Sequence, residues 1–324
     1  MTMTNSMTPE LVSVAEAYAA AHAAAVVVDH AERGMIYLTG GTRLDLINRM
    51  STQVVDKLGS GQGAATVLTT DIGRIIDRPI LYASSDAAYL LTGEGHAPAL
   101  TRFFMRNIFF NDDVQVRDIS GETAVLGVYG LRAGGMLAAA GFPETDIPLH
   151  HWREAEINGA KAYIHRTDPV AGEGYFVTAG AAGRDAVWAA LLAAGLTPMD
   201  NAAYDYLRIE AGLPRFGREL TLDYIPLETG LWADVSFSKG CYVGQEIIAR
   251  MESRGKLAKR LVRLQAEAQV ERGAEISAGG RVVGSITSAG DGPAGPLALG
   301  YVKTSALNEG AALTVNGIDV AVIL

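Results

Sequence analysis

The order of apolar and polar positions along the chain follows one plan that occurs twice. Residues 34–50 have the pattern of a short strand, a glycine turn and a helix, and residues 123–141 repeat it. Short apolar runs typical of strands follow each unit, at 64–70, 74–83 and 87–93 in the first and at 149–157, 160–167 and 174–180 in the second. Helical periodicity then closes the two units at 96–109 and 183–195.

This repeated strand-helix-strand-strand-helix order predicts an α+β fold with an internal duplication. The two halves are expected at about 34–118 and 122–195. A single repeat of this length indicates two related modules and excludes a solenoid of many short units. The sequence therefore predicts one two-lobed region with related halves.

The remaining chain divides into a closing segment and a second domain. Residues 201–213 have helical spacing with a glycine at the exit. From residue 258, short strand-like runs alternate with Gly, Pro and Asn turns, which predicts a small antiparallel barrel or sandwich. We expect a first domain at 1–257, closed by residues 200–257, and a second at 258–324.

The first residues show neither a secretory signal nor a membrane span. They lack a basic start, and the run "AAAVVV" is too short to cross a bilayer. Thr8 and Pro9 are instead the start signal of a helix beginning at Pro9. A single cysteine in 324 residues excludes an internal disulfide framework, so we expect a cytoplasmic protein without a membrane partner.

The net charge and the absence of several motifs argue against some classes of function. A net charge of -9 argues against an extended nucleic-acid surface, because such binding depends on phosphate neutralisation. The chain has no phosphate-binding P-loop, no hydrolase nucleophile elbow, and no Cys or His spacing for a metal site. A basic run from Arg250 to Arg263 is either a solvated interdomain face or a dock for an anionic ligand or partner.

The stretch "SFSKGCYVGQEIIARMESRG", residues 236–255, contains the lone cysteine, Cys241. One face of a helix that begins near Gly244 accounts for its apolar positions, which are Val243, Ile247, Ile248 and Met251. Cys241 would precede the helix N-terminus, with Lys239 nearby, and both the helix dipole and the ammonium favour a thiolate. The alternative is that Cys241 is inert apolar filling.

The residues 239–246, "KGCYVGQE", closely resemble the fingerprint of the YgfZ-type folate-binding proteins, which assist iron-sulfur cluster assembly and repair. These proteins are related to the glycine-cleavage T-protein, an aminomethyltransferase that uses tetrahydrofolate. Residues 204–220 resemble the pterin-binding segment of that superfamily, 224–231 the adjoining turn, and 70–81 the loop with the catalytic aspartate. The resemblance implies two intertwined folate-binding lobes followed by a small β-barrel.

The resemblance also implies roles for particular residues. Glu210 stands where the family carries its pterin-binding glutamate, and a carboxylate can accept both donors of a pterin edge. The alternative is that Glu210 pairs with Arg208 on a helix surface. Cys241 and Lys239 would form the functional thiol site. The fingerprint residues expected to contact the folate are Gly240, Tyr242, Gln245 and Glu246.

Asp77 marks a departure from the enzyme family. The T-protein loop carries two adjacent aspartates, whereas this chain has Asp77 followed by Arg78. We expect the neighbouring arginine to weaken Asp77 as a proton acceptor. The catalytic assignment of Asp77 is therefore open.

The sequence predicts a protein that binds tetrahydrofolate or a one-carbon derivative and supports maturation or repair of iron-sulfur enzymes. Its partners would be iron-sulfur assembly proteins or client enzymes. One cysteine cannot hold a cluster alone, so a second subunit, a small thiol or a partner would complete any such site. The alternatives are a tetrahydrofolate-dependent aminomethyl- or methyltransferase, with Asp77 as its acid-base group, and a regulatory folate-binding protein.

Overall fold

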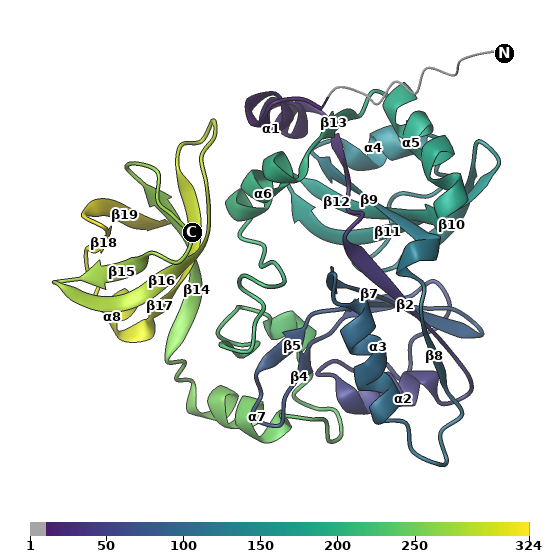
Figure 1. The fold of residues 1–324 in the computed structure, drawn as a ribbon, viewed down its shortest axis with the longest axis horizontal. Helices are drawn as coiled ribbons and strands as arrows, with labels where there is room; N and C mark the ends of the chain where they lie inside the picture. The colour runs from purple at the N-terminus through teal and green to yellow at the C-terminus, as the bar shows by residue number, and fades with distance from the viewer. Residues whose placement is uncertain (1–10, 324) are drawn as a thin grey trace.

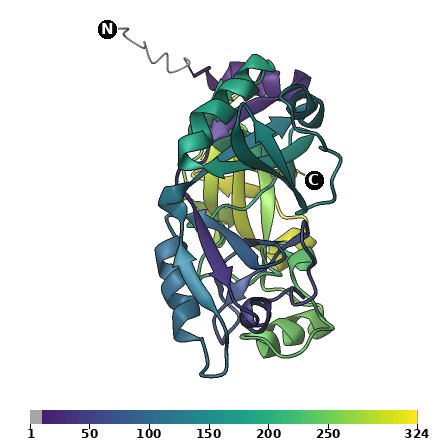
Figure 2. The same ribbon diagram turned by 90° about the vertical axis from the view of Figure 1, so that its right-hand side faces the viewer.

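The computed structural model describes residues 11–323, which form two β-sheets with flanking helices and a separate β-barrel. Figure 1 shows the barrel beside the two sheets, with the chain between α6 and α7 running down the gap between them. Seen from the side, the two sheets lie one above the other (Figure 2). The predicted helix start at Thr8 and Pro9 falls outside the described residues. The first helix there, α1 (Val14–Ala23), begins after a capping box formed by Ser13 and Glu16.

The first sheet belongs to the first half of the chain and has the strand order β3-β6-β7-β2-β8. Its strands are β2 (Arg33–Thr39), β3 (Gly63–Ala65), β6 (Ile80–Ala83), β7 (Ala87–Glu94) and β8 (Gln115–Asp118). Two helices, α2 (Arg43–Met50) and α3 (Ala97–Arg106), bury their apolar faces against this sheet in one core. A short ribbon of β4 (Leu68–Thr69) and β5 (Ile75–Asp77) stands beside it.

The second sheet has the strand order β10-β11-β12-β9-β1-β13. Its strands are β1 (Val26–Asp29), β9 (Thr123–Gly130), β10 (Trp152–Ile157), β11 (Ala160–Val170), β12 (Glu173–Gly180) and β13 (Thr197–Met199). The helices α4 (Ala133–Ala139) and α5 (Arg184–Ala193) cover one face of it. Short 3-10 turns at Ser120–Glu122 and Ala181–Gly183 precede β9 and α5.

The two sheets share one strand order, which confirms the predicted duplication. The strands β3, β6, β7, β2 and β8 correspond in position to β10, β11, β12, β9 and β1. If each unit is taken to begin with the short strand before it, β1 before β2 and β8 before β9, these two strands are exchanged, because β1 pairs with β9 and β8 pairs with β2. The sequence pattern missed β1, β8 and β13, and the exchange of β1 and β8 is what intertwines the lobes.

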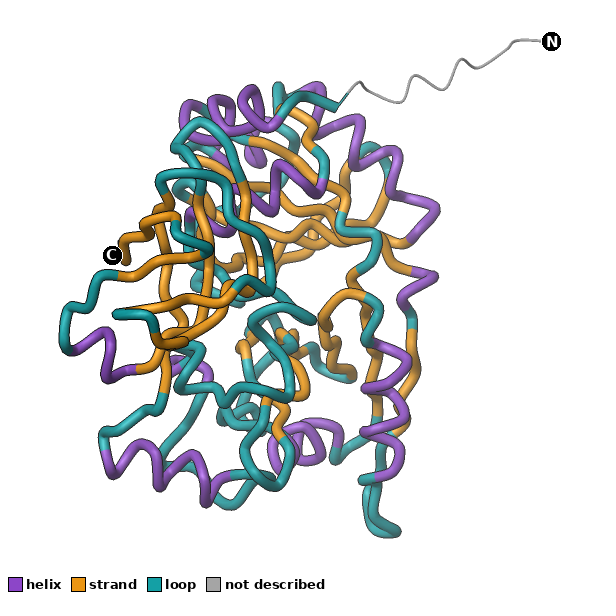
Figure 3. Tube along the Cα trace, turned by 60° about the vertical axis from the view of Figure 1, so that its left-hand side comes forward, coloured by secondary structure: helices purple, strands orange, loops and turns teal. Residues whose placement is uncertain are grey.

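A closing segment joins the lobes to the barrel. The helix α6 (Asn201–Glu210) packs with α1 on the core between the two sheets. The chain from 211 to 244 is mostly loop, as the teal tube in Figure 3 shows, and includes a 3-10 turn, η3 (Trp232–Asp234). The helix α7 (Gln245–Arg254) then leads to the barrel. No helix among residues 11–323 has the length and apolar character needed to span a bilayer.

The C-terminal strands form a closed six-stranded barrel, in agreement with the predicted barrel and not with a sandwich. They are β14 (Lys259–Ala266), β15 (Glu275–Ala278), β16 (Arg281–Gly290), β17 (Leu297–Lys303), β18 (Leu313–Val315) and β19 (Ile318–Ile323), with α8 (Thr304–Asn308) after β17. A buried network fixes the barrel to α6. Arg208 donates to Glu219 at 2.9 Å, and Ser288 of β16 donates to the other oxygen of Glu219 at 2.6 Å.

Candidate functional site

A central cavity of about 510 Å³ lies where the two lobes and the closing segment meet. Its volume is in the range typical of small-molecule sites. The first half contributes Arg33 and Arg78, and the second half contributes Tyr129, Asp168 and Phe176. The closing segment adds Tyr204 and Asp234. Three separate parts of the chain therefore build one site.

One wall of the cavity is aromatic. The rings of Tyr129 and Tyr204 are stacked with centroids 5.2 Å apart, and Phe176 meets Tyr129 edge-on at 6.5 Å. The guanidinium of Arg33 lies over the Phe176 ring, 4.9 Å from its centroid. Within residues 11–323 this guanidinium forms no ion pair within 4.0 Å and donates no side-chain hydrogen bond. The cavity thus combines flat apolar surface with a cation available to a ligand.

Behind the aromatic wall, His30 is fully buried and supports Tyr129. Its Nε2 lies 3.0 Å from the Tyr129 hydroxyl. Burial holds the pKa of His30 well below its ordinary value, and the nearby cations Arg33 and Arg215 lower it further. The imidazole is therefore neutral and acts as a fixed hydrogen-bond partner for the tyrosine.

The cavity lining also carries an ion triad. Arg78 donates through Nη1 to Asp168 at 2.9 Å and through Nε to Asp234 at 2.5 Å. Burial alone would raise the pKa of Asp168, but the Arg78 guanidinium holds it below its ordinary value. Burial opposes the charge of Arg78, and the two carboxylates outweigh it and raise the pKa of the guanidinium. All three groups therefore stay charged, and Arg78 joins β11 to η3 across the cavity.

Asp77 lies outside this site. The expectation that the Arg78 side chain acts on the Asp77 carboxylate is wrong, because the two side chains have different partners. Neighbouring side chains at the end of a strand point to opposite sides. Asp77 is buried and accepts hydrogen bonds from the Gly93 amide at 3.1 Å and the Arg78 amide at 2.7 Å, with His96 Nδ1 at 3.0 Å. The Arg78 guanidinium binds Asp168 and Asp234 instead. The cavity-facing member of this residue pair is the arginine.

Glu210 also lies outside the cavity lining. Its carboxylate accepts from the Tyr18 hydroxyl at 2.8 Å and lies 3.2 Å from Nε2 of His22, both on α1. The alternative, a pairing of Glu210 with Arg208, is wrong, because Arg208 is buried and binds Asp205 and Glu219. The nearby residues Gly212 to Pro214 do line the cavity. A folate contact by Glu210 stays a prediction.

We call residues 239–246 the thiol segment. Lys239 donates its three N–H groups to the carbonyls of Asn48, Ser51 and Gln53, at 2.7, 2.9 and 2.7 Å. Two of these acceptors lie at the end of α2 and directly after it, where helix carbonyls lack internal partners. Burial lowers the pKa of Lys239 to about 8, and the negative charge of Asp56 opposes that effect. The structure gives Lys239 this bridging role, and an action on Cys241 stays a prediction.

Most other members of the thiol segment also serve the fold. Tyr242 is buried in a small core with Leu227, Val235 and Ile248. Gly244 has φ +84°, and a Cβ there would lie 2.5 Å from the Thr70 carbonyl oxygen, so only glycine fits before α7. Gln245 begins α7, Glu246 pairs with Arg250 at 2.8 Å, and neither they nor Gly240 and Tyr242 line the cavity.

Cys241 is exposed and lies four residues before the first residue of α7. Its neighbours have structural roles: Lys239 binds carbonyls at the end of α2, Tyr242 is buried, and Gly244 permits the turn before α7. The Cys241 thiol has no packing role. This placement agrees with the accessible thiol that the sequence predicts and disagrees with apolar filling. Within residues 11–323 no group of three His, Cys, Asp or Glu side chains is arranged to hold a metal ion.

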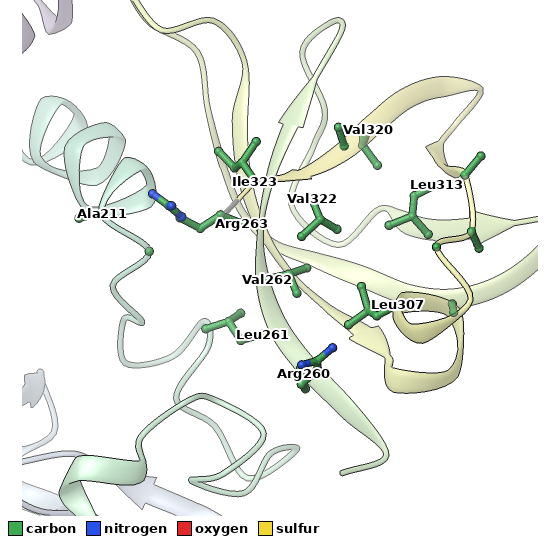
Figure 4. A pocket seen from close by; sticks show the side chains of 16 residues that line it. Ala211, Arg260, Leu261, Val262, Arg263, Leu307, Leu313, Val320, Val322 and Ile323 are labelled. Carbon is green, nitrogen blue, oxygen red and sulfur yellow. The ribbon is translucent and has the colours of Figure 1, made fainter. Parts of the chain in front are cut away.

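A second cavity of about 860 Å³ lies between the end of α6 and the barrel. Figure 4 shows its mostly aliphatic lining from the barrel, with Arg263 directed toward α6 and Arg260 farther along β14. Arg263 donates to the Glu210 carbonyl, so its charge serves the α6 C-terminus. Few polar groups converge here, and the central cavity is the better candidate for a specific ligand.

Several cavity residues were missed by the sequence reasoning. Arg33, Asp168 and Asp234 are isolated charges in their own segments, and only the tertiary structure brings them together. Tyr204 lies inside the pterin-like segment 204–220, so that segment contributes to the cavity lining, and its contact with a pterin stays a prediction. The histidines at 150 and 151 were placed in a strand, but β10 begins at Trp152 and His150 has φ +62°.

The comparisons with known proteins agree with this architecture. The family model of the GCVT N-terminal domain matches residues 7–239, and that of the glycine cleavage T-protein C-terminal barrel domain matches residues 259–321. The solved structure of the glycine cleavage system aminomethyltransferase T from Bartonella henselae has a TM-score of 0.86 at 23% identity, covering 96% of this chain and 88% of that one. This likeness concerns the fold.

Two relatives are similar over nearly the whole chain. A chloroplastic protein of Arabidopsis thaliana with the name "Putative transferase" is 31% identical over 302 residues, covering 92% of this chain and 70% of that protein. An aminomethyltransferase of Thermus thermophilus is 29% identical over 302 residues, covering 91% of this chain and 84% of that enzyme.

Proposed function

Since the chain belongs to the family defined by the GCVT N-terminal domain and the T-protein C-terminal barrel domain, we propose that it binds tetrahydrofolate or a one-carbon derivative in the central cavity. The T-proteins of this family use tetrahydrofolate. The observation that carries the proposal is the pairing of a stacked aromatic wall with a charged wall in one cavity of about 510 Å³. The ligand is assigned to the cavity and not to Glu210.

The chemistry of a reduced folate suits these two walls. The pterin is flat and partly aromatic, so it can pack against Tyr204 and Phe176. Its edge carries N–H donors that match the carboxylates of Asp168 and Asp234. The Arg33 guanidinium supplies the charge that a carbonyl or carboxylate of the ligand requires.

The comparisons favour a transferase as the activity that accompanies this binding, because the named relatives are transferases. For a one-carbon transfer, the cavity would contribute mainly by holding the reactants in position. Asp168 is the carboxylate that faces the ligand space with a quarter of its side chain exposed. Because Arg78 keeps the pKa of Asp168 low, this carboxylate is a weak proton acceptor.

A second function, support of iron-sulfur enzymes, is favoured by one observation: Cys241 is exposed while its neighbours in the thiol segment serve the fold. In this role the folate would bind in the same cavity, and the thiol would meet an assembly protein, a client enzyme or a small thiol. Asp77 would then have no catalytic duty, in keeping with its buried position.

A binding titration followed by a turnover assay tests these proposals. Calorimetry with tetrahydrofolate should give saturable binding at one site, and failure to bind at millimolar ligand would contradict the folate proposal. Turnover with a lipoyl-bound aminomethyl donor should occur if the protein is a transferase. Binding without turnover, together with loss of iron-sulfur enzyme activity in Cys241→Ser cells, would favour the second function.

A further inference from the structure

His150, in the turn before β10, has an unusual backbone conformation at the edge of the central cavity. Its φ is +62°, in the left-handed region that residues other than glycine seldom adopt. Hydrogen bonds hold this conformation, because the His150 amide donates to the Arg166 carbonyl at 2.9 Å and the Trp152 amide donates to the Gly61 carbonyl at 3.0 Å. Such strain persists where the surrounding structure enforces it, and it is frequent at ligand sites.

The carbonyl of His150 also packs against the first sheet. A Cβ added at Gly63 of β3 would lie 2.3 Å from this oxygen, so glycine is needed for the two segments to approach. The strained turn is therefore seated directly on the other lobe. This contact places the His150 side chain among the residues that line the cavity.

The imidazole of His150 is buried and has no hydrogen-bond partner in the part of the chain that the structure describes. Only 8% of the residue is exposed, and its Nδ1 is buried without a hydrogen bond among the described residues. The two other deeply buried histidines each have a partner at Nε2, Tyr129 for His30 and Thr178 for His165, although Nδ1 of His165 also has no partner among the described residues. Neither ring nitrogen of His150 forms a hydrogen bond with residues 11–323, although buried polar groups are ordinarily paired.

Burial keeps this imidazole neutral. The pKa of His150 is lowered mainly by desolvation and further by Arg78 and His151, while Asp168 and Asp234 act in the opposite direction. A neutral imidazole has one N–H donor and one acceptor nitrogen. Both functions are unused in the protein itself.

We propose that the His150 imidazole is a binding residue that hydrogen-bonds the folate in the central cavity. This inference rests on the proposed function. The ring faces the same space as the ion triad, so it would complete the polar wall for the edge of the pterin. The partner it lacks in the protein would be an N–H donor or a ring nitrogen of the ligand.

The test is the tetrahydrofolate affinity of His150→Asn, measured by calorimetry between pH 5 and pH 8. Asparagine tolerates a left-handed backbone, and His151→Asn at the adjacent half-exposed histidine is the matched control. At pH 8 we expect His150→Asn to bind about tenfold more weakly than wild type, and the control to bind within about twofold. The wild-type affinity should fall on acidification more than that of the variant, because protonation removes the acceptor.

A second variant and the resonances of the His150 ring distinguish a lost ligand contact from a loss of folding. His150→Gly removes the ring and relieves the positive φ, so thermal stability should be kept while affinity falls. In wild type, the His150 ring resonances should shift on addition of tetrahydrofolate. Equal affinity of wild type and both variants would overturn this inference alone. Absence of binding by wild type would overturn the proposed function and the inference with it.

Discussion

The central cavity and the thiol segment differ in how the chain builds them. The cavity draws Arg33, Arg78 and Asp168 from distant places and gives them their geometry through tertiary contacts. The thiol segment is eight consecutive residues, and Lys239 and Gly244 hold it to α2 and β4. Cys241 is exposed and has no partner role in this anchoring. A contiguous motif can thus mark a structural junction, while the cavity proposed as the ligand site is built from residues that are distant in the sequence.

Of the substitutions considered, we expect the largest loss of stability and of folate binding from one that disrupts the ion triad of the cavity. Arg78→Met would leave Asp168 and Asp234 as unpaired, largely buried carboxylates. We expect a loss of about 3–5 kcal/mol in the free energy of unfolding, together with loss of folate binding. Urea denaturation measures the first effect, and calorimetry on the folded fraction measures the second.

The control for Arg78→Met is Arg117→Gln, which breaks an exposed ion pair with Glu122. The free energy of unfolding should then change by less than about 1 kcal/mol. If both variants lost the same small amount, the triad would not hold the cavity together.

A smaller effect is expected at the anchor of the thiol segment. Lys239→Met removes the donor to three backbone carbonyls, so we expect a loss of about 2 kcal/mol in the free energy of unfolding. Folate affinity should stay within about twofold of wild type, because Lys239 does not line the cavity. Lys161→Met, at an exposed pair with Glu154, is the matched control. A stability equal to that of the control would show that the three carbonyls are satisfied without Lys239.

The buried His165, in the second sheet, is expected to make the free energy of unfolding depend on pH. Burial lowers the pKa of His165 to about 3, whereas the unfolded chain has an ordinary histidine pKa of about 6.5. As the pH falls below about 6.5, the unfolded state binds a proton that the folded state does not, so stability is lost. From pH 7.5 to pH 5 this contribution is about 2 kcal/mol.

His165→Asn should therefore flatten the acid limb of the stability curve, measured by urea denaturation at several pH values. The control His151→Asn, at a half-exposed histidine, should keep the wild-type slope. A slope in His165→Asn equal to that of wild type would assign the acid sensitivity to other groups.

The smallest effect on stability is expected at Cys241. Because the thiol is exposed and has no packing role, Cys241→Ser should change the free energy of unfolding by less than about 0.5 kcal/mol. Wild type should react with iodoacetamide in the native state, and folate affinity should be unchanged in the variant. Labelling only after denaturation would contradict the exposed position.

Local pattern was sufficient for most of the fold. The two helix-containing units, the helix after residue 200 and the barrel all follow from periodicity and turn residues, and the structure has them. The strands β1 and β8 were missed because each is only four residues long and pairs with a strand distant in the sequence, β1 with β9 and β8 with β2, which no local pattern encodes. The lobes are therefore predictable as modules, whereas their exchange of strands is not.

The candidate site was less predictable than the fold, because most of its contacts are between residues distant in the sequence. Cys241 and the helix after it were found because dipole, exposure and spacing are local properties. The direction of Asp77 and Arg78 depends on where a strand ends, and the partners of Arg78 come from 90 and 156 residues away. Such pairings are set by tertiary contacts that a single sequence does not specify.

The central claim, that the folate lies in the cavity, is tested most directly by tetrahydrofolate affinity in two variants. Arg33→Met removes the unpaired cation of the cavity, and Glu210→Gln alters the carboxylate that lies outside it. We expect Arg33→Met to weaken binding at least about tenfold, and Glu210→Gln to bind within about twofold of wild type. Strong loss of binding in Glu210→Gln with unchanged affinity in Arg33→Met would contradict the account and place the pterin at α6.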